Sequence, residues 1–219
     1  MEQKQEKVIL FVNGDLPNPE SLRSQISDND FLIAVDGGLR HIIHLDLMPN
    51  LIIGDLDSAR PEDIAHFRQL GMEVRQYPED KDETDLEIAL QAALSMQPRE
   101  IWVVAALGKR LDQTLGNIFL LTHPDLSDSN IRLMDGHEEV FLIRHSAKIS
   151  GRVGDQVSLL PLHGPVNGIF THGLQYPLVG ETLFPHRTRG ISNRMTESTA
   201  SISVQSGLLL CIHTLNEDN

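Results

Sequence analysis

Aspartates follow a short apolar run in the segment LIIGDLDSA, residues 51–59, where Asp55 and Asp57 stand one residue apart. Three more aspartates, Asp80, Asp82 and Asp85, occur in the segment DKDETD. Carboxylates crowded in this way repel one another, and Mg²⁺ removes that cost because it binds carboxylate, phosphate and water oxygens. The spacing therefore indicates a site for Mg²⁺ and a phosphate compound.

Two further motifs carry glycine and positive charge, VDGG at residues 35–38 and LGKRLDQTLGN at residues 107–117. Lys81 and Arg110 are suited to contact phosphates, and glycine allows the backbone to approach a ligand closely. All four motifs follow predicted strands, and ligands of open parallel sheets bind outside the carboxyl ends of the strands. We therefore expect loops that are distant in sequence to converge on one edge and to form a Mg²⁺–nucleotide site.

Each motif also has a simpler interpretation when it is taken alone. The paired aspartates of GDLDS suit a capped turn, and those of DKDETD suit the positive end of a following helix. The pair Gly37-Gly38 lacks the full dinucleotide-binding pattern, and Arg110 with Asp112 is compatible with a surface ion pair of little energetic value. The metal–phosphate interpretation is favoured because it accounts for all four motifs together.

The elements that must position these motifs are predicted from the hydrophobic pattern. Short apolar runs predict strands at residues 8–12, 31–35, 51–53, 73–77, 101–105 and 131–134. Helix start signals occur at Asn18-Pro19, at Pro61 and at Thr84, and apolar residues repeat at helical spacing from Leu111. Strands that alternate with helices predict an α/β domain, with a mostly parallel sheet covered by helices on both faces.

From about residue 136, short β-prone runs are separated by glycine and proline, and no helical pattern follows. The runs are residues 140–143, 157–160, 168–171, 182–184, 201–204 and 208–212. This spacing is typical of an antiparallel sandwich or barrel. We therefore predict two domains, residues 1–138 and 139–219, and assign the second as an all-β sandwich.

Composition disfavours several classes of function. The 219 residues include 18 Lys and Arg against 31 Asp and Glu, and the formal charge of −13 disfavours nucleic-acid binding, which needs basic residues. No stretch approaches the roughly 20 apolar residues of a membrane span, and no signal-peptide pattern is present. The single cysteine, Cys211, is interpreted as a small buried apolar residue. We expect a cytoplasmic protein that binds neither nucleic acid nor a membrane.

Six motifs resemble, in their order and approximate spacing, those of the thiamine pyrophosphokinase family: VDGG, GDLDS, DKDETD, GKRLDQTLGN, GLQYPL at residues 173–178 and GISN at residues 190–193. The resemblance covers roughly residues 8–212. It implies an α/β catalytic domain, a β-sandwich domain for thiamine binding and dimerisation, and a homodimer with active sites at the subunit interface. It also implies transfer of the pyrophosphoryl group of ATP to the hydroxyl group of thiamine, which gives thiamine diphosphate and AMP.

The resemblance further implies roles for individual residues. The Mg²⁺–phosphate centre would comprise Asp55, Asp57, Asp82 and Asp85. The residues bordering ATP would be Asp36, Gly37, Gly38, Lys81, Arg110 and Gln113. Catalytic roles would fall to Asp55, Asp57, Asp82 and Asp112, of which Asp82 and Asp112 are the candidates for accepting the hydroxyl proton. The pyrimidine of thiamine would contact Ser192 and Asn193.

The chain departs from the family pattern at Gln113, where many relatives have histidine, so no proton-transfer role is assigned to it. Two alternatives of other kinds remain open. A phosphatase or phosphotransferase would use Asp55 as a covalent nucleophile, but this leaves DKDETD and the C-terminal motifs unexplained. A non-catalytic acidic module would bind Ca²⁺ or a protein partner, but no spaced calcium-loop pattern supports it.

Overall fold

The computed structural model describes residues 6–108 and 110–216. The chain forms two compact units that divide after Gly136. The first unit contains parallel strands and helices, and the described part of the second contains strands without a helix.

The first unit is built on a six-stranded sheet in which every neighbouring pair is parallel. Its strands lie in the order β4-β3-β2-β1-β5-β6. The strands are β1 (Lys7–Phe11), β2 (Phe31–Val35), β3 (Leu51–Gly54), β4 (Glu73–Gln76), β5 (Glu100–Val104) and β6 (Ile131–Met134). All six predicted strands are confirmed. The strands β1, β2, β3, β5 and β6 are apolar and mostly buried, whereas β4 lies at the edge of the sheet and is largely exposed.

Helices connect these strands, and those that start at Pro19, Pro61, Asp85 and Leu111 begin where the sequence predicts a helix start. The α-helices are α1 (Pro19–Arg23), α2 (Leu39–His44), α3 (Pro61–Gln69), α4 (Asp85–Ser95) and α5 (Leu111–Leu120), and the 3₁₀ turns are η1 (Asp36–Gly38) and η2 (Pro124–Leu126). The Asn18 side chain accepts a hydrogen bond from the Ser21 amide at the start of α1, and Thr84 accepts one from the Glu87 amide at the start of α4. Within residues 6–108 and 110–216, every helix is too short or too polar to cross a membrane.

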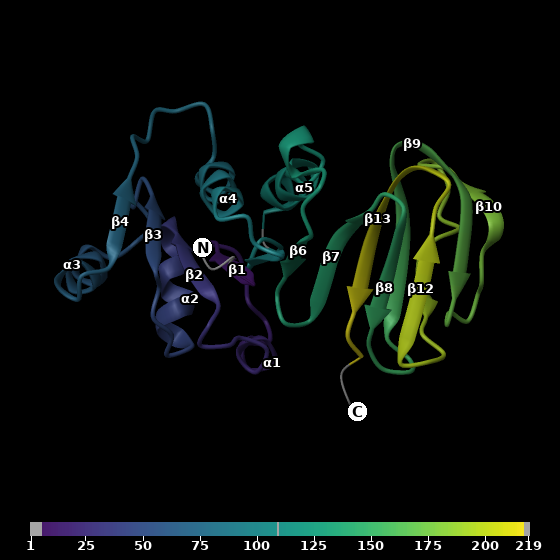
Figure 1. The fold of residues 1–219 in the computed structure, drawn as a ribbon, viewed down its shortest axis with the longest axis horizontal. Coiled ribbons are helices and arrows are strands. Elements are labelled where there is room, and N and C mark those ends of the chain that lie inside the picture. Colours follow the sequence, from purple (N-terminus) through teal and green to yellow (C-terminus); the bar gives the residue numbers. More distant parts are fainter. Residues whose placement is uncertain (1–5, 109, 217–219) are drawn as a thin grey trace. The chain divides into compact units, whose positions relative to one another are not determined.

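The helices cover both faces of the sheet, as predicted. Strand residues alternate between faces, and Ile9 and Phe11 of β1 lie in one core cluster with buried residues of α1, α2 and α3. The helix α4 buries Leu86 and Leu90 and contacts β1, β2 and β3 from the opposite side (Figure 1). The strands are therefore held on both faces, and their carboxyl ends are left free to carry loops.

The second unit is an antiparallel sandwich of two sheets that share one long strand. Its strands are β7 (Glu138–Ile143), β8 (Ser146–Ser150), β9 (Gln156–His172), β10 (Val179–Leu183), β11 (Asn193–Arg194), β12 (Thr199–Ser203) and β13 (Ser206–Thr214). The first part of β9 pairs with β13 and β11, and the last part pairs with β12 and β10. Apolar side chains from both sheets form a separate core cluster, so the sandwich prediction is confirmed.

The prediction of separate strands at residues 157–160 and 168–171 is wrong, because both belong to β9. The intervening prolines and glycines suggest a break, but they form a bend, in which His163 has φ 61° and Gly164 has φ 151°. The strand keeps a pairing partner on each side of the bend and passes from one sheet to the other. No apolar run marks β8 or β11, because β8 is largely polar and β11 has two residues.

A buried charged group ties the ends of several strands of the second unit together. His213 of β13 places Nε2 3.1 Å from Asp155 Oδ2 and Nδ1 3.5 Å from Glu139 Oε2. Burial works to lower the pKa of His213, but the two carboxylates outweigh it and raise this pKa. Burial opposes ionisation of Asp155, yet the amides of Arg152 and Asn216 and the His213 ring lower its pKa overall. The polar group is thus buried with its charges paired, which avoids the cost of an isolated charge.

Candidate functional site

The carboxyl ends of the parallel strands collect the predicted motifs along one edge of the sheet, together with strained backbone. Among non-glycine residues, Asp36 after β2, Leu56 after β3 and Ala105 after β5 have φ values of 48°, 68° and 59°. These left-handed conformations cost energy for residues with a side chain, and they tend to occur at functional sites. Of the five such residues described in the first unit, these three lie at the same edge as the motifs, and the other two, Asp46 and Gln97, follow α2 and α4.

The spacing of Asp55 and Asp57 has a structural explanation in the residue between them. Leu56 packs against the core cluster that contains Ile9 and Phe11. The Asp57 amide donates to Asp55 Oδ1 at 3.1 Å, and the Ser58 hydroxyl donates to Asp57 Oδ1 at 2.9 Å. The simpler interpretation as a capped turn thus fits one oxygen of Asp55, which accepts from a backbone amide, whereas Asp57 accepts from the neighbouring side-chain hydroxyl. The other oxygen of each adds negative charge to this edge.

Asp36 joins these two aspartates. One carboxylate oxygen from each of Asp36, Asp55 and Asp57 lies within 4.8 Å of the other two. Burial raises the pKa of Asp36, the Gly37 and Ser58 groups that bond to it act in the opposite direction, and the charge of Asp55 raises it further. We call these three residues the aspartate cluster. An all-oxygen set of this kind fits a hard divalent cation, which would relieve the repulsion between the carboxylates.

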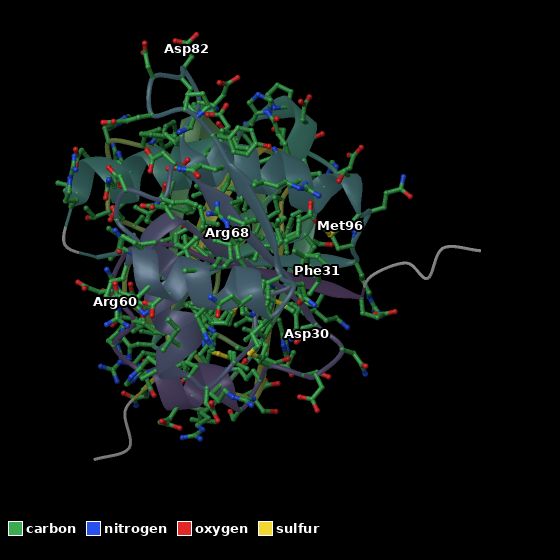
Figure 2. The ribbon with its side chains drawn as sticks, turned by 90° about the vertical axis from the view of Figure 1, so that its left-hand side faces the viewer. Asp30, Phe31, Arg60, Arg68, Asp82 and Met96 are labelled. Atoms are coloured by element: carbon green, nitrogen blue, oxygen red, sulfur yellow. The ribbon has the colours of Figure 1, made fainter. Side chains whose placement is uncertain are left out.

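The segment between β4 and α4 brings only part of DKDETD toward the aspartate cluster. Lys81 Nζ lies 3.0 Å from Asp85 Oδ1 and 4.0 Å from Asp55 Oδ2, and so connects the two motifs. Asp82 is exposed at the tip of the segment, where Figure 2 labels it. Of the four residues predicted to form the metal centre, Asp55 and Asp57 lie together, Asp85 approaches through Lys81, and Asp82 lies outside the cluster.

The two glycines of VDGG have a packing role. A Cβ atom on Gly38 would lie 1.8 Å from the carbonyl oxygen of Phe11, and one on Gly37 would lie 2.6 Å from the Asn13 side chain. The turn η1 therefore lies so close to the end of β1 that only glycine, which has no Cβ atom, fits at Gly38. The prediction that these glycines border ATP rests on the family motif alone. The structure gives a separate reason for glycine at these positions, which is the lack of space for a side chain.

The loop after β1 lies at the centre of the same edge, and no predicted site residue belongs to it. Arg40 of α2 donates to the carbonyl oxygens of Asn13 and Gly14 at 2.9 Å and 2.7 Å, and also to the Asn13 side chain. His41 Nε2 lies 3.0 Å from the Gly14 carbonyl oxygen. The motif VNGD, residues 12–15, follows a predicted strand as the other motifs do. Its place after a strand is the feature of the sequence by which this loop could have been found.

The loop after β5 is fixed by polar side chains of α5. The Thr114 hydroxyl donates to the Gly108 carbonyl at 3.0 Å, and Asn117 donates to the Ala106 carbonyl at 2.8 Å. Arg110 donates two hydrogen bonds to the Asp112 carboxylate, and both side chains are mostly exposed. The bonds from Arg110, followed by the Gln113 amide, lower the pKa of Asp112. Gln113 is exposed one residue further on.

In the second unit, the motifs GLQYPL and GISN lie side by side. Asn193 is buried, accepts a hydrogen bond from the Tyr176 amide at 3.0 Å, and donates one to the Tyr176 carbonyl at 2.8 Å. Ser192 is exposed with φ 60°, and its amide donates to the Ser158 hydroxyl at 3.1 Å. The two residues predicted to contact thiamine therefore differ in exposure. Asn193 is buried and joins the two motifs by its hydrogen bonds to Tyr176, whereas Ser192 is exposed to solvent.

Comparisons with known proteins match two segments of the chain to one family. Residues 22–134 match the family model of the thiamin pyrophosphokinase catalytic domain, and residues 143–209 match that of the thiamin pyrophosphokinase vitamin B1 binding domain. The thiamine pyrophosphokinase of Bacillus subtilis (strain 168) is 28% identical over 212 residues, which are 95% of this chain and 99% of that protein. Thiamine pyrophosphokinase 1 of Oryza sativa subsp. japonica is 29% identical over 185 residues, 80% of this chain and 69% of that protein.

Solved structures have the same fold. The crystal structure of the Bacillus subtilis thiamine pyrophosphokinase superposes with a TM-score of 0.87 at 25% identity, over 97% of this chain and 100% of that one. The thiamin pyrophosphokinase of Geobacillus thermodenitrificans superposes with a TM-score of 0.83 at 25% identity, over 97% of this chain and 99% of that one. The match therefore extends over both units.

Proposed function

The chain belongs to the thiamin pyrophosphokinase family, and we propose that the aspartate edge of its first unit is where ATP gives its pyrophosphoryl group to thiamine. The reaction forms thiamine diphosphate, and AMP is the product left from ATP. The observation that carries the assignment of this site is the aspartate cluster, with three carboxylate oxygens within 4.8 Å of one another. Neither alternative, the Asp55 nucleophile or the non-catalytic module, accounts for the two matched domains.

In this proposal Asp36, Asp55 and Asp57 hold Mg²⁺. When bound, the ion would neutralise charge on the phosphates of ATP and orient the β-phosphoryl group. The sequence prediction places Asp36 beside ATP, whereas this proposal assigns it as a metal ligand because it lies with Asp55 and Asp57. Asp85 supports the cluster through Lys81. Asp82 is kept only as a candidate for the base that accepts the hydroxyl proton of thiamine.

The polyphosphate of ATP meets Lys81 and Arg110, with Gln113 and the VDGG backbone beside it. Arg110 also pairs with the second candidate base, and this ion pair lowers the pKa of the Asp112 carboxyl group. A base with a lowered pKa accepts a proton less readily. We propose that Arg110 leaves Asp112 for a phosphate, so that Asp112 gains basicity when ATP is in place.

Thiamine binding belongs to the second unit in this proposal, with Ser192 as the direct contact and Asn193 as the residue that shapes the site. The two chains of a homodimer would combine the first unit of one copy with the second unit of the other. Apolar side chains support a dimer: Leu111, Leu115 and Phe119 repeat along α5 and are exposed, and Phe170 and Val179 pair as exposed neighbours on β9 and β10. A cytoplasmic location remains part of the proposal.

The test is to incubate the protein with Mg²⁺, ATP and thiamine and to separate both products by chromatography. We expect one AMP for each thiamine diphosphate, with no product when Mg²⁺ is removed by a chelator. ADP together with thiamine monophosphate would instead identify a kinase that transfers the γ-phosphoryl group. A phosphoenzyme labelled at Asp55 would support the phosphatase alternative, and Ca²⁺ binding without turnover would support the non-catalytic module.

A further inference from the structure

Lys81 holds a positive charge between two carboxylates that come from different elements. Its ammonium group lies 3.0 Å from Asp85 Oδ1 at the start of α4 and 4.0 Å from Asp55 Oδ2 after β3. It also donates a hydrogen bond to the Pro78 carbonyl at 2.9 Å. The side chain is 13% exposed, so its charge is only partly screened by solvent.

The charge of Lys81 persists at neutral pH. Burial works to lower its pKa, but the Asp85 carboxylate and then the charges of Asp55 and Asp36 outweigh this effect and raise it. Two members of the aspartate cluster, Asp55 and Asp36, thus interact with the ammonium group as well as with each other. The same cluster would receive a divalent cation.

A fixed ammonium group has opposite effects on the two parts of a metal–nucleotide complex. It repels a divalent cation bound by the neighbouring carboxylates, and it attracts the phosphate oxygens that such a cation carries. Without it, the cluster would attract bare cations more strongly, and its uncompensated negative charge would repel the polyphosphate.

We infer that Lys81 makes the aspartate cluster select a divalent cation that is already complexed with a polyphosphate over the bare cation. The inference rests on the proposed function, because it assumes that the cluster is the metal site of the pyrophosphoryl transfer. It assigns Lys81 a role in specificity that is separate from holding the segment between β4 and α4 in place.

The test measures binding in the absence of turnover. Mn²⁺ alone is titrated into the protein and free Mn²⁺ is followed by electron paramagnetic resonance. Binding of the Mg²⁺ complex of the α,β-methylene analogue of ATP, which cannot transfer the pyrophosphoryl group, is followed by isothermal titration calorimetry. In Lys81→Met we expect Mn²⁺ alone to bind about tenfold more tightly and the nucleotide complex to bind about tenfold more weakly.

Three further variants separate charge from structure. Lys81→Arg keeps the charge and should leave both affinities within about twofold of the original protein. Lys81→Gln loses the charge but retains a donor for the Pro78 carbonyl, and it should behave like Lys81→Met. Lys148→Met removes an exposed lysine on β8 of the second unit and should change neither affinity. Thermal unfolding of each variant checks that the fold is intact.

Two results would overturn the inference in distinguishable ways. If the original protein binds both probes and Lys81→Met and Lys81→Gln bind Mn²⁺ no more tightly than it does, Lys81 is a structural tie and only the inference fails. If the original protein binds neither Mn²⁺ nor the nucleotide complex, the metal assignment of the aspartate cluster fails, and the proposed function fails with it.

Discussion

At the scale of single residues, the pattern Asp-Leu-Asp divides two tasks between neighbouring side chains. Leu56 adopts φ 68° and packs against the core, while Asp55 and Asp57 each use one oxygen in the turn. The strain of Leu56 is tolerated because its apolar contacts over-determine the conformation. The turn therefore presents two carboxylates beside Asp36.

Replacing Asp55 or Asp57 by Asn tests whether their charge has this role. Asparagine keeps an oxygen that accepts the turn hydrogen bond, so each variant mainly removes a negative charge. We expect turnover with Mg²⁺ to fall about a hundredfold or more. The melting temperature without metal should stay the same or rise slightly, because a source of repulsion is lost.

The control for these variants is Asp128→Asn, which neutralises an exposed aspartate between η2 and β6. It should leave turnover and melting temperature unchanged. Near-normal turnover in both Asp55→Asn and Asp57→Asn would show that these carboxylates are turn residues, and the metal assignment would be wrong.

At the scale of elements, the site depends on how closely helices and turns approach the ends of the strands. The turn η1 presses against β1 at Gly38, Arg40 of α2 holds the loop after β1, and Thr114 of α5 holds the loop after β5. Each contact joins an element to a strand end that precedes it in the chain. The positions of the functional loops are therefore set by neighbouring elements as well as by the strands that carry them.

The close approach at Gly38 predicts a large effect for Gly38→Ala. Gly38 has φ −61°, which any residue adopts, so only space is limiting. The added Cβ would lie 1.8 Å from a backbone oxygen of the central strand, which cannot move without distorting the sheet. We expect a loss of about 3 kcal/mol in the free energy of unfolding, measured by urea denaturation.

A matched glycine in the same unit should respond in the opposite direction. A Cβ atom on Gly116, inside the exposed helix α5, would meet nothing within 4 Å. Gly116→Ala should therefore stabilise the protein by up to about 1 kcal/mol. Equal stability of Gly38→Ala and the original protein would contradict the packing role assigned to Gly38.

At the scale of the whole molecule, the two units carry different parts of the proposed reaction. The aspartate cluster, Lys81 and Arg110 belong to the first unit, and Ser192 belongs to the second. Both units also expose apolar side chains along α5 and on β9 and β10. A dimer that pairs unlike units of two copies would cover apolar surface and complete the site at once.

Mixing two inactive variants tests this arrangement. Asp55→Asn disables the first unit, and Ser192→Phe places a bulky ring where thiamine is proposed to bind. If the site is shared between subunits, mixed dimers have one intact site of two, so equal amounts exchanging at random should recover about a quarter of the original activity. Asn193 is unsuitable for this experiment, because its loss would also release the clamp on Tyr176.

Subunit exchange is verified separately by co-purification of differently tagged copies. Mixing Asp55→Asn with Asp57→Asn is the control, since both changes lie in the same unit and no dimer of the two has an intact site. If exchange occurs and the first mixture remains inactive, each site lies within one chain, and the shared-site proposal is wrong.

Local pattern was sufficient for the strands and helices of the first unit, for the caps at Asn18 and Thr84, and for the placement of the acidic motifs after strands. These features depend on the period of apolar residues and on hydrogen bonds within a few residues, so they can be read along the chain. The family resemblance added the reaction, because six motifs in order are specific. The prolines and glycines inside β9 predict a break that the structure does not have, because pairing with distant strands outweighs their local preference.

The membership of the aspartate cluster depended on the folded chain. Asp36 joins Asp55 and Asp57 because β2 and β3 are neighbours in the sheet and Leu56 is held in a left-handed conformation by the core. Asp82 and Lys81 belong to the same motif, but Asp82 faces solvent and lies outside the cluster. Lys81 is held between Asp85 and Asp55. Strand order and packing join residues far apart in sequence, and these contacts leave no local pattern to read.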